Sequence, residues 1–252
     1  MARVTTEALA LRRTPFRETS QIAEFLTRDR GRVGLILKGV MRPKSRKGGG
    51  VDLLDHCRVT FTARRGSRSM PPLVERQVLS HHPGMRRRED LMRAGLYMLE
   101  LLRALVPEGQ RSPGLFGLSV AFLGALDTEP PPEQVPAMTF ALEGGLLRMT
   151  GFELVLDRCV SCHRRPEGNM ALRCDPQRGG IVCSACRDGE GSFVPLASAS
   201  ARLIQGLAGA DPRRLDHLTL PESTVNDIRR FYDRTFLHVL ERPPRAAVMS
   251  RR

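Results

Sequence analysis

The first third of the chain alternates apolar and polar positions in the manner of short β-strands. The alternation is clearest in residues 58–63 (RVTFTA), where valine and phenylalanine alternate with polar side chains. The pattern predicts five strands, at residues 4–11, 21–27, 33–37, 58–63 and 73–79. Five short strands separated by glycine-containing turns favour a small closed or sandwiched β domain. A five-stranded Greek-key barrel that binds single-stranded nucleic acid is one natural candidate.

After the predicted strands, the apolar positions change to the spacing of amphipathic helices. Apolar residues recur every three or four positions in residues 89–106, and Pro107 and Gly109 end this stretch. The same spacing predicts helices at residues 89–106, 113–126, 133–149, 198–207 and 224–240. Their apolar stripes are typical of a packed helical core. We therefore expect an α+β protein with two domains, residues 1–80 and residues 81–252.

Length and hydropathy favour a protein of the cytoplasm. The chain has 252 residues, which is enough for one or two domains at roughly 100–200 residues each. No apolar run approaches the roughly 18 residues of a membrane span, and the N-terminus lacks the apolar segment of a secretory signal. We therefore expect the six cysteines to be reduced thiols or metal ligands and not three disulfides.

The charge is strongly positive and unevenly distributed. The chain carries 40 Lys and Arg against 27 Asp and Glu, a net charge of +13. Residues 1–80 account for +10 of it, residues 81–158 for −2 and residues 159–252 for +5. Arginine supplies 37 of the 40 cations, and a codon bias toward arginine explains that choice but not the excess over acids. A polyanionic partner, such as nucleic acid or an anionic membrane, fits this excess.

One segment of the basic third stands out as a candidate for phosphate contacts. Residues 38–47 (KGVMRPKSRK) carry five cations and no acid, and such loops suit the sequence-independent phosphate backbone. Its candidate DNA-binding residues are Lys38, Arg42, Lys44, Arg46 and Lys47. Arginines near the end of the first predicted strand and at a later turn can widen this surface, namely Arg12, Arg13, Arg64 and Arg65. A solvated charge run with no partner is the alternative.

Base stacking has few candidate side chains in this sequence. The chain has no Trp and two Tyr. Stacking in the basic third would fall to Phe16, Phe25 or Phe61, each of which is more typical of a core position. We therefore expect binding that is dominated by the phosphate backbone and tolerant of sequence.

Two Cys-x-x-Cys pairs predict a metal site. Cys159 and Cys162 form the first pair, Cys183 and Cys186 the second, with 20 residues between the pairs. This spacing is typical of a structural zinc site. Each pair makes a tight turn that presents two sulfurs, and two facing turns supply a tetrahedral set for one Zn²⁺. Because four protein thiolates leave no open coordination position, such a zinc would support the structure without taking part in chemistry.

Other interpretations of the cysteines remain open at this point. A thiol–disulfide motif uses a single Cys-x-x-Cys beside a βαβ unit, and residues 159–163 also spell the haem attachment pattern, which requires export. Unmetallated buried cysteines are a further possibility. Cys174 or His163 can replace one ligand, or Cys174 can be a small apolar filler. Cys57 is expected in the core.

No catalytic motif is present in the sequence. The chain lacks a phosphate-binding loop, GxGxxG, HExxH and GxSxG. The basic third holds seven scattered acids, whereas a nuclease needs clustered carboxylates to hold Mg²⁺. We therefore expect a protein that is not an enzyme.

The order of these features resembles a known family. The run ALALRRTPFRETSQIAEFLTRDRGRVGLILKGVMRPKSR looks like the N-terminal domain of the bacterial recombination mediator family RecO. The matching elements are Glu18-Thr19-Ser20, Thr27 with Gly31, and Lys38-Gly39 with Ser45-Arg46. The helical part is similar too, through YMLELLRALVPEG and FALEGGLLRMTGFELVLDRCVSC. The segment GGGVDLLDHC departs from the family pattern, so the start of the fourth strand is not fixed by the resemblance.

The resemblance implies both a fold and a function. The fold is an OB-type five-stranded barrel followed by an all-helical domain that carries a four-cysteine zinc ribbon at about residues 157–190. The function is binding of single- and double-stranded DNA, annealing of complementary strands, and help in loading recombinase onto strands coated by single-strand-binding protein. The implied partners are RecR, and in many members RecF. The basic loop at 38–47 and the four paired cysteines fall at the family's DNA and zinc positions.

Two other classes of function remain as alternatives. One is a zinc-ribbon RNA-binding protein associated with the ribosome or with transcription. The other is a zinc-dependent hydrolase. A strand-annealing assay separates the first from a recombination mediator, and metal analysis of cysteine variants addresses the second.

Overall fold

The N-terminal part of the chain folds into a five-stranded antiparallel sheet that closes on itself. The computed structural model describes residues 2–42, 49–63, 70–166, 172–186 and 193–244. The strands are β1 (Ala2–Phe16), β2 (Ser20–Thr27), β3 (Gly31–Leu37), β4 (His56–Ala63) and β5 (Leu73–Ser80). Their order is β3-β2-β1-β4-β5. Ile36 bridges in parallel to Pro72, just before β5, so the two edges meet. The result is an OB-type barrel, as expected.

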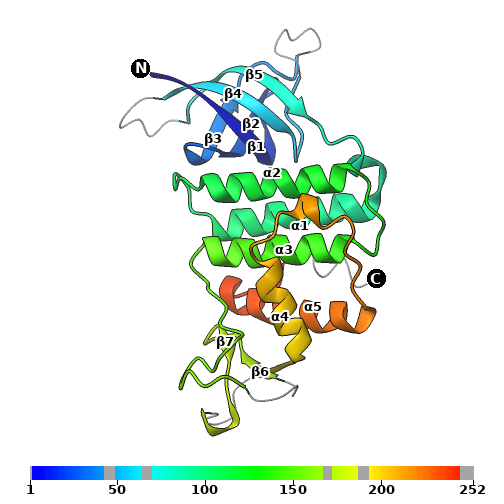
Figure 1. The fold of residues 1–252 in the computed structure, drawn as a ribbon. Coiled ribbons are helices and arrows are strands. Elements are labelled where there is room, and N and C mark those ends of the chain that lie inside the picture. The colour runs from blue at the N-terminus through cyan, green and yellow to red at the C-terminus, as the bar shows by residue number, and fades with distance from the viewer. Residues whose placement is uncertain (1, 43–48, 64–69, 167–171, 187–192, 245–252) are drawn as a thin grey trace.

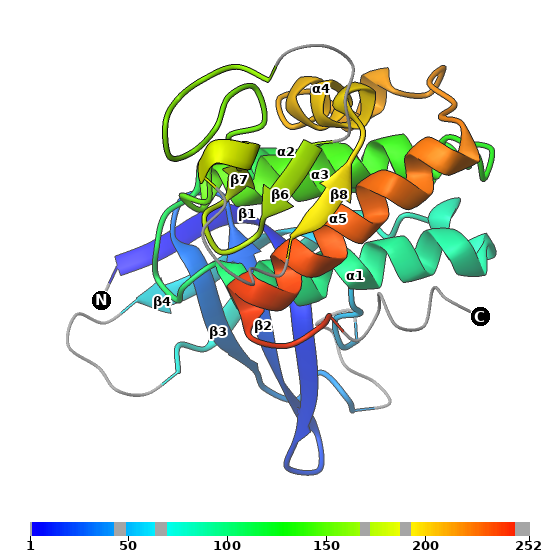
Figure 2. The ribbon, with the colours of Figure 1, turned by 90° about the horizontal axis from the view of Figure 1, so that it is seen from below.

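Strand β1 is longer than the sequence pattern predicts. Residues 2–9 pair with β4 and residues 8–16 pair with β2, so one strand serves both neighbours. A bulge between Ala10 and Arg12 separates the two halves and bends the strand. Beyond the bulge, β1 and β2 project as a hairpin from the barrel (Figure 2). Apolar and polar residues do not alternate in the hairpin, because it does not pack on a core. The sequence pattern therefore predicts that the strand ends at Leu11.

In the part of the chain that the structure describes, five α-helices form the rest of the core. They are α1 (Glu89–Leu105), α2 (Pro113–Asp127), α3 (Val135–Met149), α4 (Ser198–Leu207) and α5 (Glu222–Leu240). Each lies within two residues of its predicted bounds, because proline and glycine punctuate the apolar stripes. Helices α1–α3 form a layer with the barrel on one side and α4, α5 and a second small sheet on the other (Figure 1). No helix in the described ranges has the length and hydropathy of a membrane span.

The small sheet belongs to the module that contains the paired cysteines. Its strands are β6 (Leu172–Asp175), β7 (Gly180–Ile181) and β8 (Val194–Leu196), in the order β7-β6-β8. Strands this short bury little surface of their own. Leu172, Ile181 and Leu196 instead pack into the apolar core that the helices build.

The barrel and the helical layer share apolar packing. Leu9, Leu11 and Leu26 of the barrel belong to the same core as residues of α1 and α2. A separate core inside the barrel is built around Phe25, Val59 and other buried side chains. The division at residues 80 and 81 stays a prediction, and the shared core indicates that the two parts hold each other in place.

Arg32 ties β3 of the barrel to the end of α1. Its Nε donates to Glu24 Oε1 at 2.6 Å, and Nη1 donates to the carbonyl oxygens of Arg103 at 2.7 Å and Val106 at 2.5 Å. The Arg32 side chain is only 12% exposed. We expect Arg32→Ala to lower the free energy of unfolding by about 2 kcal/mol, because two carbonyl oxygens lose their donor and Glu24 keeps only its ion pair with Arg103 Nε at 3.6 Å.

Urea denaturation followed by circular dichroism measures this loss. Arg28→Ala is the matched control, because Arg28 is 59% exposed and lies 4.0 Å from Glu7. The control should change stability by less than about 0.5 kcal/mol. Equal stability of the two variants would show that the Arg32 contacts do not hold the junction.

A carboxyl group is buried in the helical core. Glu143 of α3 is 3% exposed and accepts a hydrogen bond from Tyr97 Oη at 2.5 Å, while its Oε2 has no hydrogen-bond partner among the described residues. Burial raises the pKa of Glu143 from 4.5 to about 7, against the opposing charge of Arg229. The group is therefore largely neutral in the folded chain below pH 7.

This raised pKa makes stability depend on pH. Between pH 4.5 and 7 the folded chain holds a proton at Glu143 that the unfolded chain releases. The contribution of Glu143 to stability therefore falls as pH rises through this window, by up to about 3 kcal/mol. The Glu143→Gln side chain can still accept a hydrogen bond from Tyr97, and it should lose the pH-dependent contribution to stability. We therefore expect Glu143→Gln to be more stable than the wild-type chain at pH 8. Denaturation at pH 5 and pH 8 checks this, and parallel profiles would contradict it.

Candidate metal centre and nucleic-acid interface

Four cysteine sulfurs converge in the module between α3 and α4. The Sγ atoms of Cys159, Cys162, Cys183 and Cys186 all lie within 4.8 Å of one another. Cys162 Sγ lies 3.6 Å from Cys183 Sγ. The two pairs predicted from spacing are therefore brought together, and their arrangement can hold one metal ion.

Backbone hydrogen bonds place the first cysteine turn against β7. Val160 N donates to Ile181 O at 2.9 Å, and Ile181 N donates to Val155 O at 3.0 Å. Gly180 permits this approach, because a Cβ there would lie 2.3 Å from Val155 O and 2.6 Å from Val160 Cγ1. The position of the first cysteine turn therefore depends on a close backbone contact that a glycine at position 180 allows.

The donor set fits zinc. Burial alone would raise the pKa of the Cys159 thiol, but amide groups of Cys183, Cys162 and Ser161 point at its sulfur and bring its pKa down to about 6. A thiolate at this position is the form that binds a metal. Four sulfur ligands in a close set are characteristic of tetrahedral structural zinc. Such a site would fasten the two halves of the module and would leave no position for substrate.

The alternative ligands lie outside this set. Cys174 is fully buried in β6, and burial raises the pKa of its thiol to about 12. It is the small apolar filler that was one of its two expected roles. His163 is exposed, with a positive φ of 59°. Cys57 is buried in the barrel core, as expected.

The predicted DNA-binding residues that the structure describes gather near one end of the barrel. Lys38 and Arg42 are exposed in the turn after β3, and Arg12 and Arg13 are exposed on the outer half of β1. Arg13 Nη1 lies 2.5 Å from Asp52 Oδ1. Five predicted residues fall outside the described ranges: Lys44, Arg46, Lys47, Arg64 and Arg65.

The turn after β3 is attached to the β1–β2 hairpin. Gly39 N donates to Ser20 Oγ at 3.3 Å, and Met41 N donates to Thr19 O at 3.0 Å. The two basic segments are therefore one surface, which we call the hairpin end of the barrel. Chemically it offers exposed guanidinium and ammonium groups on hydrogen-bonded strands and turns, which suits a phosphate backbone.

One aromatic residue at this end was misplaced by sequence reasoning. Phe25 and Phe61 are buried, as expected, but Phe16 is only half-buried and belongs to neither apolar core of the described chain. The Arg17 guanidinium lies over its ring, 5.3 Å from the centroid. The signal was present in the sequence, because Pro15 and the polar run Arg17-Glu18-Thr19 already mark a turn.

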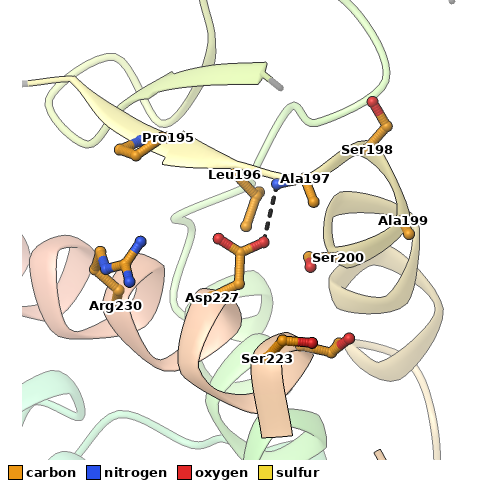
Figure 3. Close-up of a pocket in the computed structure, with 10 residues that line it drawn as sticks. Pro195, Leu196, Ala197, Ser198, Ala199, Ser200, Ser223, Asp227 and Arg230 are labelled. Carbon is orange, nitrogen blue, oxygen red and sulfur yellow. Dashed lines mark hydrogen bonds between the residues drawn. The ribbon is translucent and has the colours of Figure 1, made fainter. Parts of the chain in front are cut away.

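An open cleft of about 530 Å³ lies between β8 and the first turns of α4 and α5 (Figure 3). Asp227 and Arg230 of α5 line it, with Ser198 at the start of α4. The Asp227 carboxylate accepts from Ala197 N at 2.9 Å. Since Ala197 has no capping side chain of its own, Asp227 caps α4 from a neighbouring helix. The acid in this cleft thus has a structural role.

Comparison with known proteins places the whole chain in one family. A family model described as "Recombination protein O N terminal" matches residues 1–79, and one described as "Recombination protein O C terminal" matches residues 89–247. The DNA repair protein RecO of Desulforudis audaxviator is 30% identical over 252 residues, which cover 100% of this chain and 98% of the relative. RecO of Anaeromyxobacter dehalogenans strain 2CP-C is 33% identical over 83% of each chain. With the barrel, the helical layer and the cysteine cluster in place, the chain belongs to the recombination protein O family, RecO.

Proposed function

We propose that this chain is a DNA-binding recombination mediator in DNA repair. It would anneal complementary single strands and help to load recombinase onto strands coated by single-strand-binding protein. The observation that carries the proposal is the hairpin end of the barrel, where exposed cations of two hydrogen-bonded segments share one surface. Membership of the RecO family supports a role in DNA repair and recombination.

Annealing by such a surface requires no covalent chemistry. Two complementary strands repel each other through their phosphates, and bound cations reduce that repulsion. A surface that contacts mainly the backbone leaves most base edges free to pair. We therefore propose that the protein is not an enzyme. We further propose that it acts in the cytoplasm of a bacterium, in association with the nucleoid.

The other parts of the proposal follow the family. Residues 1–80 would bind DNA, and residues 81–252 would support the barrel and carry one structural zinc. Proposed partners are single- and double-stranded DNA, RecR, in some settings RecF, and single-strand-binding protein. No membrane partner is proposed.

A fluorescence-quench assay with complementary DNA oligonucleotides tests the function. We expect the protein to speed pairing at least about tenfold at low salt and progressively less as salt screens the phosphate contacts. The assay is repeated with strands coated by single-strand-binding protein, and with RNA oligonucleotides of the same sequence. Acceleration with RNA alone would favour the ribosome- or transcription-associated alternative, and failure to bind any oligonucleotide in dilute buffer would reject both.

A further inference from the structure

The outer face of the β1–β2 hairpin carries a large aromatic side chain outside the protein cores. Phe16 pairs with Ser20, and Thr14 pairs with Ile22. Directly paired residues share a face of the sheet, and so do residues two apart along one strand. The opposite face holds Gln21, which is 4% exposed and hydrogen-bonds to the backbone of Val51, a residue of the barrel core. Phe16 therefore lies on the exterior of the barrel.

The surroundings of Phe16 are cationic. The Arg17 guanidinium covers its ring, with the guanidinium carbon 5.3 Å from the ring centroid. Arg12 lies on the same face of β1, four residues earlier. Lys38 and Arg42 belong to the turn that hydrogen-bonds to the hairpin. Glu18 is the one acidic residue between positions 12 and 20.

A half-buried aromatic ring on the outside of a basic surface has a specific use in nucleic-acid binding. Bases stack on aromatic side chains and on guanidinium planes whatever their sequence, because every base has a π-face. In a duplex, neighbouring bases already cover those faces. A stacking side chain therefore discriminates in favour of single strands, which cations alone do not do.

We propose that Phe16, backed by Arg17, is a base-stacking platform that gives the hairpin end of the barrel a preference for single-stranded over double-stranded DNA. The inference deepens the proposed function and rests on it. One unpaired base would stack on the Phe16–Arg17 pair while Arg12, Lys38 and Arg42 contact the flanking phosphates. The strand would then bind mainly through its backbone with a single aromatic anchor.

The absence of tryptophan from the chain allows a direct test. Phe16→Trp introduces a sole indole at the hairpin, and its fluorescence should be strongly quenched by oligo(dT) but little changed by a blunt duplex. Phe152→Trp is the matched control. Phe152 is 43% exposed and follows α3, where the chain leads into the cysteine module on the far side of the helices from the barrel (Figure 1). Its fluorescence should not respond to either DNA.

Affinities measured by fluorescence anisotropy complete the test. Phe16→Ala and Phe16→Leu should each weaken oligo(dT) binding about tenfold, leave duplex affinity within about twofold and keep the salt slope. Phe16→Tyr should bind as wild type. Thermal melts confirm that the variants fold.

The outcomes separate this inference from the proposed function. If the wild-type chain binds DNA but Phe16→Trp is not quenched, the stacking platform is wrong and the proposed function stands. Equal loss of single-strand and duplex affinity in Phe16→Ala and Phe16→Leu also overturns it. No binding of DNA by the wild-type chain overturns both.

Discussion

Replacing Cys162 with serine is expected to reduce bound zinc from one per chain to nearly none and to loosen the module around it. The module has strands of four, two and three residues, too short to hold two cysteine turns together by packing alone. Structural zinc contributes roughly 10–16 kcal/mol of binding free energy in isolated finger peptides. Loss of one of four thiolates therefore removes the main tie between the residue 159–162 turn and the residue 183–186 turn.

The effect should extend into the helical body. Leu172, Ile181 and Leu196 of the module pack in the same apolar core as the helices. A loss of about 3 kcal/mol there would lower Tm by roughly 6–12 °C in a chain of this size. Zinc content by atomic emission, thermal melts and hydrogen exchange of residues 155–186 measure the three consequences together.

Cys174→Ala is the control for this prediction. Cys174 is fully buried in β6, within the same module, but lies outside the sulfur cluster. The variant should keep one zinc per chain and lose only packing. Retention of stoichiometric zinc by Cys162→Ser, or its loss from Cys174→Ala, would show that the donor set is assigned incorrectly.

The convergence of the four cysteine sulfurs was predictable because its information is local. Two Cys-x-x-Cys turns and their separation determine which sulfurs can meet, whatever lies between them. The excluded candidates were not predictable in this way. Cys174 faces the core because of the register of β6 with β7, in which it pairs with Ile181. Register is set by the packed fold and not by spacing along the chain.

The helices were predictable for a similar reason, and the hairpin was not. Each helix has an apolar stripe bounded by proline or glycine, so its periodicity and its ends are written in adjacent residues. In β1, apolar alternation stops where the strand leaves the core, although its pairing with β2 continues to Phe16. The sequence pattern therefore predicts a core position for Phe16, whereas its pairing with Ser20 places it outside the barrel.

Without the fold, net charge does not show which cations form internal contacts and which are exposed. The basic third contains cations that hold the structure together as well as cations whose side chains are exposed to solvent. Arg32 fastens the barrel to α1. Arg76 donates to the carbonyl oxygens of Gly49 and Gly50 and so holds these two residues against β5. Such residues raise the net charge of the chain while their guanidinium groups serve internal contacts.

The triple variant Lys44→Ala, Arg46→Ala and Lys47→Ala is expected to cause the largest loss of DNA affinity. These residues fall outside the described ranges, but both neighbours of their segment, Arg42 and Gly49, are described. Arg42 lies at the hairpin end, and Arg76 holds Gly49 from β5. Three lost phosphate contacts should flatten the plot of log affinity against log salt by about 2 for single strands and about 3 for duplex.

The same slopes fix the size of the loss at each salt concentration. Counterion release makes each contact strongest in dilute buffer and negligible near 1 M salt. Single-strand affinity should therefore fall on the order of 10²-fold at 50 mM salt and on the order of 10-fold at 200 mM. Fluorescence anisotropy over this range measures both the slope and the loss, and annealing should slow in parallel.

A second triple variant with the same change in net charge distinguishes the loss of local DNA contacts from the effect of overall charge. Arg202, Arg214 and Arg234 are exposed in or near α4 and α5, and their replacement by alanine also removes three positive charges. If DNA binds at the hairpin end of the barrel, this second triple should leave the salt slope nearly unchanged. Equal flattening by both triples would mean that the chain attracts DNA through its overall charge, and the basic loop would then have no special place in binding.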